Sequence, residues 1–98
     1  KKLDEERKHA SDETKVVIAF EIATIDLIAK PSSKTRRKDL SKKMREVFKN
    51  EVWIQLDASL KSRCERLLTS IVEQELFTEQ QQLTLLQKYK DMVENTNN

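Results

Sequence analysis

The 98-residue chain contains no glycine and only one proline, Pro31. Sheets need tight turns, and tight turns use glycine, asparagine and proline to reach special backbone angles. Helices joined by short polar loops have no such requirement. A chain of this length forms one domain with a single modest core. The composition therefore favours a small all-α domain.

Cysteine and histidine are almost as scarce. Cys64 cannot form an internal disulfide, and with His9 as the only histidine the chain lacks the ligands of the common structural zinc sites. No acidic residue pairs with a histidine, a serine or a second cysteine at a spacing typical of an activated nucleophile. The longest apolar run, residues 16–20, is too short to span a bilayer. We therefore expect no catalytic residue, no metal, no cofactor and no membrane partner.

Three ranges of the chain differ in composition. Residues 1–15 are mostly charged, so we expect a weakly ordered or weakly helical lead-in, with Ser11 or Asp12 capping the helix that follows. Residues 16–94 contain apolar stripes at helical spacing and are expected to form the folded domain. Residues 95–98 are expected to be a frayed tail.

The first predicted helix covers residues 16–30 and is apolar around most of its circumference, which is typical of a helix in the middle of a bundle. It ends at Lys30, because the residue before a proline disfavours the helical conformation. The repeat that defines its stripe is Ile18, Ile22, Ile25 and Ala29. Ser33 or Thr35 is expected to cap a second helix, from about Arg36 to beyond Lys49. Its apolar side is Leu40, Met44, Val47 and Phe48.

Two further helices are predicted, while residues 50–57 either extend the second helix or form an irregular connection. Asp57 or Ser59 is expected to cap the third helix. Its apolar residues are Leu60, Cys64, Leu67, Leu68, Ile71 and Val72. Thr78 and Gln81 fit a capping box that opens the fourth helix, whose inward residues are Leu85, Leu86, Tyr89, Met92 and Val93. Such helices bury their stripes only against one another, so the sequence predicts an all-α bundle of about four helices.

Positive charge is concentrated in residues 30–49, which contain nine basic and two acidic residues. Residues 67–98, by contrast, contain two basic and five acidic residues. At about 100° per residue, four cations of the second helix lie within roughly 60° of one another, nearly opposite its apolar side. These four are Lys38, Lys42, Arg45 and Lys49. Arg36 and Arg37 add charge at the first turn of the same helix.

This basic stripe has two interpretations. A charged helix face is often simply solvated, and the spacing pairs Asp39 with Lys43 and Glu46 with Lys42, which compensates part of the charge. Alternatively, segregated charge attracts acidic or phosphate-bearing partners, either a nucleic-acid backbone or an acidic or phosphorylated protein segment. Single-stranded nucleic acid is the weaker candidate, because such sites interleave aromatic with basic residues. A lysine-rich face would contact duplex phosphates without reading sequence.

Trp53 also has two interpretations. It lies in the apolar stretch of residues 52–56 and either closes the core of the bundle or forms an exposed anchor. An exposed tryptophan beside a basic stripe suits a partner's amphipathic helix or an acidic and hydrophobic motif. Self-association through residues 52–56 or the fourth helix is a further alternative.

Together these features favour a non-catalytic protein-interaction module that recruits an acidic or phosphorylated partner segment. Small helical bundles recur as recruitment modules in transcription, chromatin and trafficking proteins, although fold alone does not establish function. The expected partner-binding residues are Arg36, Arg37, Lys38, Lys42, Arg45, Lys49 and Trp53. The alternatives are a nucleic-acid-binding module that uses the same stripe and a self-association domain.

Localisation is expected to be nuclear, with the cytoplasm as the alternative. Residues 34–38, KTRRK, are similar to a short nuclear import signal. A single cysteine needs no oxidising compartment. Because the chain begins with Lys1 and not methionine, we expect it to be part of a longer protein.

Overall fold

The computed structural model describes residues 11–97, and the side chains of residues 11–95. This part of the chain contains no strand. Its helices are α2 (Asp12–Ala29), α3 (Lys34–Val47), α4 (Asn50–Trp53), α5 (Ala58–Glu73) and α6 (Gln80–Asn97). The prediction of a small all-α fold is confirmed. Residues 1–10 of the predicted lead-in lie outside the described residues, whereas residues 12–15 belong to α2.

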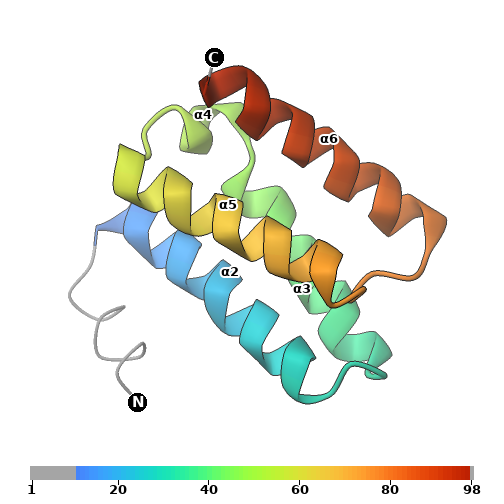
Figure 1. The fold of residues 1–98 in the computed structure, drawn as a ribbon. Helices are drawn as coiled ribbons and strands as arrows, with labels where there is room; N and C mark the ends of the chain where they lie inside the picture. Colours follow the sequence, from blue (N-terminus) through green and yellow to red (C-terminus); the bar gives the residue numbers. More distant parts are fainter. Residues whose placement is uncertain (1–10, 98) are drawn as a thin grey trace.

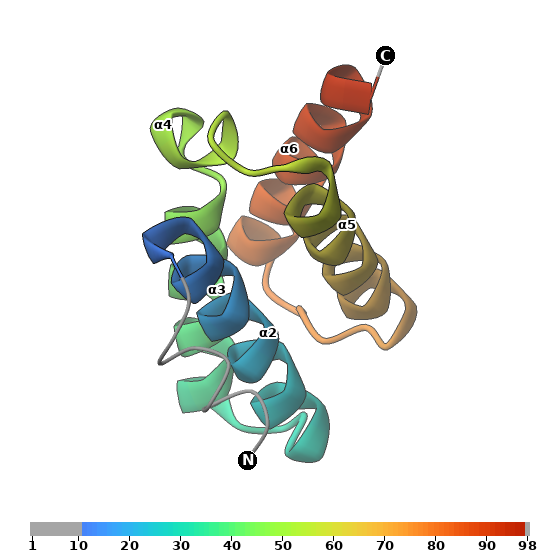
Figure 2. The same ribbon diagram turned by 90° about the vertical axis from the view of Figure 1, so that its left-hand side faces the viewer.

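The helices form two hairpins. α2 runs antiparallel to α3, and α5 runs antiparallel to α6 (Figure 1). Figure 2 shows the hairpins side by side, with the short helix α4 at one end, where the chain passes from α3 to α5. α2 packs against both α3 and α5, and α5 packs against α6. The four long helices therefore enclose one common core.

Three helices begin at a residue whose side chain caps the helix. In each case it is the first of the two capping candidates predicted from the sequence. Each capping oxygen satisfies an amide at the start of a helix that has no intrahelical partner. The oxygens are Ser11 Oγ, 3.3 Å from Thr14 N, Ser33 Oγ, 3.2 Å from Arg36 N, and Asp57 Oδ1, 2.9 Å from Leu60 N.

α3 ends earlier than the sequence predicted. Its last helical residue is Val47, and Phe48 is the C-cap, with its N–H donating to Met44 O. Lys49 is extended and occupies the N-cap position of α4. The prediction that the helix continues beyond Lys49 was therefore wrong. The open question about residues 50–57 is resolved as one helical turn followed by a non-helical connection.

α6 also begins at a different residue from the one predicted. The N–H of Leu83 donates to Glu79 O over 3.0 Å, which places Glu79 in the N-cap position and makes Gln80 the first helical residue. The capping box that began at Thr78 was thus one residue too early. The preceding Leu76 and Phe77 are both buried, and their packing in the core determines where the chain can turn into α6.

The buried side of α2 differs in phase from the predicted stripe. Ile25 is 48% exposed and Ala29 is also exposed, whereas Thr24 is buried. The Thr24 hydroxyl donates to Phe20 O over 2.9 Å, so its burial leaves no unsatisfied polar group. The orientation of an almost wholly apolar helix is difficult to predict from sequence, because several of its faces are apolar enough to be the buried one.

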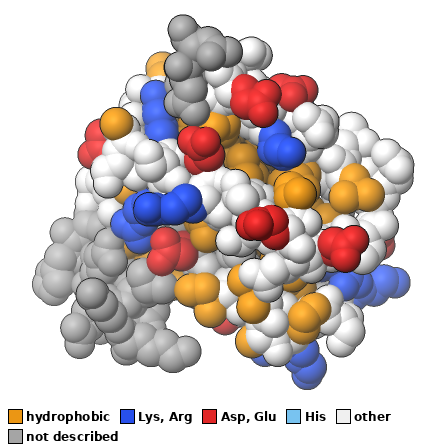
Figure 3. Space-filling view, viewed as in Figure 1, with side chains coloured by type: hydrophobic (Ala, Val, Ile, Leu, Met, Phe, Trp, Pro, Cys, Tyr) orange, Lys and Arg blue, Asp and Glu red, His pale blue; other side chains and the backbone are white. Residues whose placement is uncertain are grey.

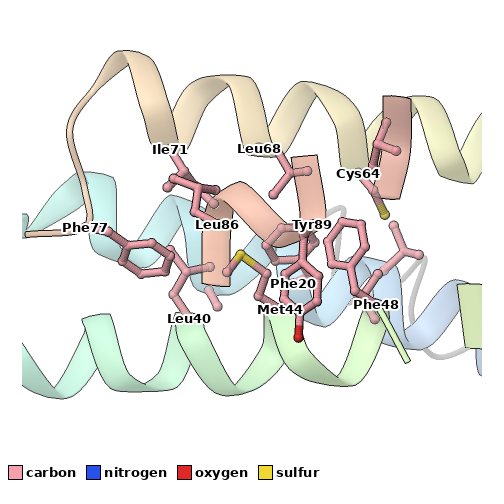
Figure 4. Packing of buried hydrophobic residues seen from close by; sticks show 14 of the residues in the cluster. Phe20, Leu40, Met44, Phe48, Cys64, Leu68, Ile71, Phe77, Leu86 and Tyr89 are labelled. Atoms are coloured by element: carbon pink, nitrogen blue, oxygen red, sulfur yellow. The ribbon is translucent and has the colours of Figure 1, made fainter. Parts of the chain in front are cut away.

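Side chains from all four long helices meet in the core (Figure 4). The buried apolar residues of this cluster are Val17, Phe20, Ala23, Leu27, Leu40, Met44, Val47, Phe48, Trp53, Leu56, Cys64, Leu68, Ile71, Leu76, Phe77, Leu86, Tyr89 and Val93. Most of the residues predicted to face inward on the second, third and fourth helices belong to it. Val72 is an exception, because 41% of its surface is exposed.

Candidate functional site

The cations of α3 project from the side of the helix opposite the core. Lys34, Lys38, Lys42 and Arg45 recur at three- and four-residue spacing and are all exposed, whereas Met44 is fully buried. We call these four cations the basic face. Neither Lys38 nor Lys42 makes a hydrogen bond or ion pair with another described residue. The face formed by α2, α5 and α6 differs, because single acidic, basic and apolar side chains are interspersed there (Figure 3).

Lys49 is exposed but does not belong to this face. The helix has ended at Val47, so the helical spacing that aligned Lys49 with Lys42 no longer applies. Lys49 instead extends the positive charge into the α3–α4 connection. The predicted stripe of four cations is therefore shorter at this end, and Lys34 lengthens it at the other.

Arg36 and Arg37 support the fold at the α2–α3 connection. Arg36 Nη1 donates to Asp26 O over 2.8 Å, and Arg37 Nη1 donates to Pro31 O over 2.8 Å. Asp26 lies in the last turn of α2, where carbonyls lack intrahelical partners and favour cations. Both arginines are half-buried, so these bonds hold the loop that carries Ser33 and the start of α3.

Charge compensation along α3 is incomplete. Lys43 Nζ lies 3.7 Å from Asp39 Oδ1, as the spacing predicted. The second predicted pair, Lys42 with Glu46, does not form among the described residues. Lys43 is half-buried and lies beside the basic face, so the one compensated lysine is not one of the four exposed cations.

Trp53 lies inside the core and is only 3% exposed. Its ring stacks on Phe48, with centroids 4.9 Å apart, and Lys61 Nζ lies 5.6 Å from the centroid of the indole ring. The interpretation of Trp53 as a core-closing residue is confirmed, and its interpretation as an exposed anchor was wrong. The single turn of α4 causes this, because it directs Trp53 back onto the end of α3.

A cavity of about 370 Å³ adjoins the basic face, between α3 and the first turns of α6. Its lining residues are Lys38, Ser41, Arg45, Glu79, Gln81, Gln82 and Leu85. Gln82 is 7% exposed, and its Oε1 has no hydrogen-bond partner. Leaving such an acceptor unsatisfied costs about 1–3 kcal/mol. We call this cavity the Gln82 pocket.

The sequence prediction did not include the residues that form this pocket with the cations. Gln82 precedes Leu86 by four residues and therefore lies on the inward side of α6, where a polar residue is unusual. A polar residue at this inward position was the sequence feature that could have indicated the pocket. Ser41 is also buried, and its Oγ accepts from Arg45 Nη1 over 3.0 Å, which fixes the guanidinium at the mouth of the pocket.

A second hollow is an open groove of about 970 Å³ between α4 and the outer side of α6. Ile54 and Leu83 line it, and they are 73% and 42% exposed. Lys88 and Asp91 contribute opposite charges, so the groove has no dominant sign. It coincides with the surface that the sequence indicated for self-association.

Cys64 is the only cysteine in the chain and is fully buried. Burial raises the pKa of its thiol from 9.0 to about 12, with a smaller lowering by Arg63 and a smaller raising by Glu21. The thiol therefore stays protonated near neutral pH, whereas a reactive cysteine needs the thiolate. Cys64 is a core residue of α5.

None of the helices in the described part of the chain has the length and apolar character needed to cross a membrane. Residues 11–97 also contain no group of three or more histidine, cysteine, aspartate and glutamate side chains that could hold a metal ion. No protein-family model, curated protein or solved structure matches the chain. Its function is therefore inferred from its own residues.

Proposed function

We propose that the domain is a non-catalytic protein-interaction module that binds an acidic or phosphorylated segment of a partner on the basic face. The observation that carries this proposal is the exposure of Lys38 and Lys42 on one helix face without partners among the described residues. Cations placed in this way lose no intramolecular bond when they contact a carboxylate or a phosphate. Their field would also accelerate the encounter with an acidic partner.

The proposal uses fewer of the predicted residues than the sequence suggested. Arg45, Lys49 and the lysines of the basic face remain available at the surface. Arg36 and Arg37 already donate to backbone carbonyls, so they support the surface from below. Trp53 contributes to the core and not to a docking site.

Nucleic acid fits the same surface less well. Phe48 and Trp53 are the aromatic residues nearest to the cations in sequence, and both are buried, so they offer no ring on which a single-stranded base could stack. Duplex contact would depend on phosphates alone. A nuclear protein that recruits acidic partners remains the proposed context, consistent with the motif at residues 34–38.

Fluorescence anisotropy of the 98-residue chain tests the proposal. The probe is a short labelled peptide rich in Asp and Glu with interspersed Leu and Phe, and a neutral peptide of the same apolar content serves as reference. The test variant is Lys38→Ala/Lys42→Ala/Arg45→Ala, in which all three changes lie on the basic face. Three surface contacts of roughly 0.5 kcal/mol each amount to about tenfold in Kd, so we expect this loss and a marked salt dependence.

The matched control is Lys15→Ala/Arg66→Ala/Lys88→Ala, which removes two lysines and one arginine at exposed positions of α2, α5 and α6. Both triple variants have the same net charge, so only the position of the lost charges differs. An equal loss of binding in both variants would show that net charge alone is responsible. Tighter binding of a short DNA duplex than of the acidic peptide at about 0.15 M salt would also overturn the proposal.

A second candidate function is self-association through the groove between α4 and α6. The observation in its favour is the exposure of Ile54, whose side chain adjoins the apolar lining of that groove. Sedimentation equilibrium compares the chain with Ile54→Lys. Dimers that dissociate in the variant would support this candidate, and a monomer at high concentration in both proteins would exclude it.

A further inference from the structure

The Gln82 pocket collects hydrogen-bond donors from two helices. Lys38 and Arg45 reach it from α3, and Ser41 offers its hydroxyl proton, because its oxygen already accepts from Arg45. The donors approach from different directions and converge on one cavity. An anionic group with several acceptor oxygens matches that arrangement.

Gln81 and Gln82 of the pocket lining belong to the first turn of α6, where backbone amides are available to a ligand. The bond from Leu83 N to Glu79 O is the first of the helix, so the preceding amides have no intrahelical partner. The positive end of the helix dipole points toward the same place. A helix start alone does not make a binding site, but here it coincides with the cations of α3 and with a buried amide.

Gln82 is the independent sign that a ligand belongs in the pocket. It occupies the inward position four residues before Leu86 and seven before Tyr89, where an apolar side chain would pack without loss. Its enclosed Oε1 has no partner, so the residue destabilises the folded domain. Nε2, unlike Oε1, is not enclosed and makes no hydrogen bond with another described residue, so it is the end of the amide that can donate to a ligand. It therefore adds another donor to those of Lys38 and Ser41.

We infer that the Gln82 pocket receives the phosphoryl group of a phosphorylated side chain in the partner segment. This inference rests on the proposed function and identifies the position of the phosphate on the domain. A phosphomonoester carries close to two negative charges and three acceptor oxygens, which suits two cations and neutral donors around it. A carboxylate would use fewer of these donors.

Glu79 has the opposite effect in this arrangement. Its carboxylate lines the pocket, is exposed, and would repel a phosphate. Removing its charge should therefore strengthen phosphate binding. A pocket that merely completes the core would show no such response.

NMR titration of the 98-residue chain measures this directly. Three probes are used: an acidic peptide with a central phosphoserine, the same peptide with serine, and N-acetyl-phosphoserine amide. We expect the phosphopeptide to bind about tenfold more tightly than the serine peptide. The amide signals of Ser41, Gln81 and Gln82 should shift with both phosphorylated probes and not with the serine peptide.

Two variants test the residues. Gln82→Met keeps the side-chain length without the amide, so we expect it to unfold at higher denaturant concentration while the preference for phosphoserine falls to about one. Gln87→Met is the matched control on an exposed position of α6 and should keep the preference. Glu79→Gln should raise the affinity for the phosphorylated probes severalfold.

The outcomes separate this inference from the proposed function. Equal affinity for the two peptides, with no shift caused by N-acetyl-phosphoserine amide, would overturn the phosphate pocket and leave the basic face as an acidic-segment site. Shifts at Gln81 and Gln82 with N-acetyl-phosphoserine amide alone, and no binding of either peptide, would support the pocket and overturn the recruitment proposal. A Gln82→Met variant that retains the phosphoserine preference would also overturn the pocket.

Discussion

The ring of Phe48 stacks on the ring of Tyr89, with centroids 4.6 Å apart and planes inclined by 13°. Phe48 also stacks on Trp53 and meets the edge of Phe20, so one residue at the end of α3 contacts rings from α2, α4 and α6. Figure 4 shows the Tyr89 hydroxyl directed toward α3. One aromatic cluster therefore contributes to the contact between the two hairpins.

Phe48→Leu should destabilise the domain by more than the same change at Phe77. Both phenylalanines are buried, but Phe77 has no ring partner among the described residues. Aromatic pairs contribute about 0.5–1.5 kcal/mol beyond their buried area, so we expect an excess cost of roughly 1–2 kcal/mol at Phe48. Urea unfolding of both variants measures the difference. Equal costs would show that the ring geometry adds nothing to simple burial.

The fold was predictable because α3, α5 and α6 each carry one clear apolar side. Leu40 and Met44 are both buried, as their spacing indicated. Helical periodicity, however, no longer predicts side-chain directions once the helix has ended. Phe48 ends α3 and Lys49 is extended, so the directions of Lys49 and Trp53 could not be extrapolated from the preceding turns.

The candidate site was predictable only in part. The exposure of Lys38, Lys42 and Arg45 followed from their position opposite the apolar side of α3. The Gln82 pocket depends on how α6 packs beside α3, and no spacing within one helix contains that information. The polar residue on the inward stripe of α6 indicated an anomaly without indicating its partners.

The ion pair between Arg63 and Glu21 should couple α5 to α2. Arg63 Nε and Nη2 both donate to Glu21 Oε1, over 3.3 and 3.1 Å, and both side chains are mostly shielded from solvent. A double-mutant cycle with Glu21→Gln and Arg63→Met should give a coupling of about 1–2 kcal/mol, between the values for surface and buried pairs. The less shielded pair of Lys43 and Asp39, four residues apart on α3, is the control and should give about 0.3–0.5 kcal/mol. Similar couplings for the two pairs would contradict the prediction.

Glu75→Gly should stabilise the domain. Glu75 follows the C-cap of α5 with φ at 50°, in the left-handed region that favours glycine. Its N–H donates to Val72 O, and the N–H of Leu76 donates to Ile71 O, which is the hydrogen-bond pattern of a Schellman motif. Relief of the backbone strain, reduced by the greater freedom of glycine in the unfolded chain, should yield about 0.5–1 kcal/mol in urea unfolding.

The control for this change is Glu73→Gly. Glu73 is an exposed helical residue two positions earlier, where glycine should cost about 1 kcal/mol. The two substitutions remove the same carboxylate side chain from neighbouring positions, so loss of negative charge near the end of α5 is common to both. Destabilisation by both variants would show that residue 75 is not strained.

The stability of the domain should fall as the pH rises above 9. Burial raises the pKa of the Cys64 thiol from 9.0 to about 12, so between these values the unfolded chain releases this proton while the folded chain retains it. The stabilisation is therefore fully present below pH 9, and each pH unit above it removes up to about 1.4 kcal/mol. Burial likewise raises the pKa of Tyr89, and Arg45 partly offsets this rise. The ionisation of Tyr89 therefore adds a loss of stability in the same direction above its ordinary pKa of 10.0.

Urea unfolding from pH 7 to 11 measures the slope of the unfolding free energy against pH. Cys64→Ala should give a shallower slope, whatever the stability of the variant at pH 7, because the ionisation of the thiol no longer contributes. Parallel slopes in the two proteins would show that the thiol does not titrate with the unfolding reaction.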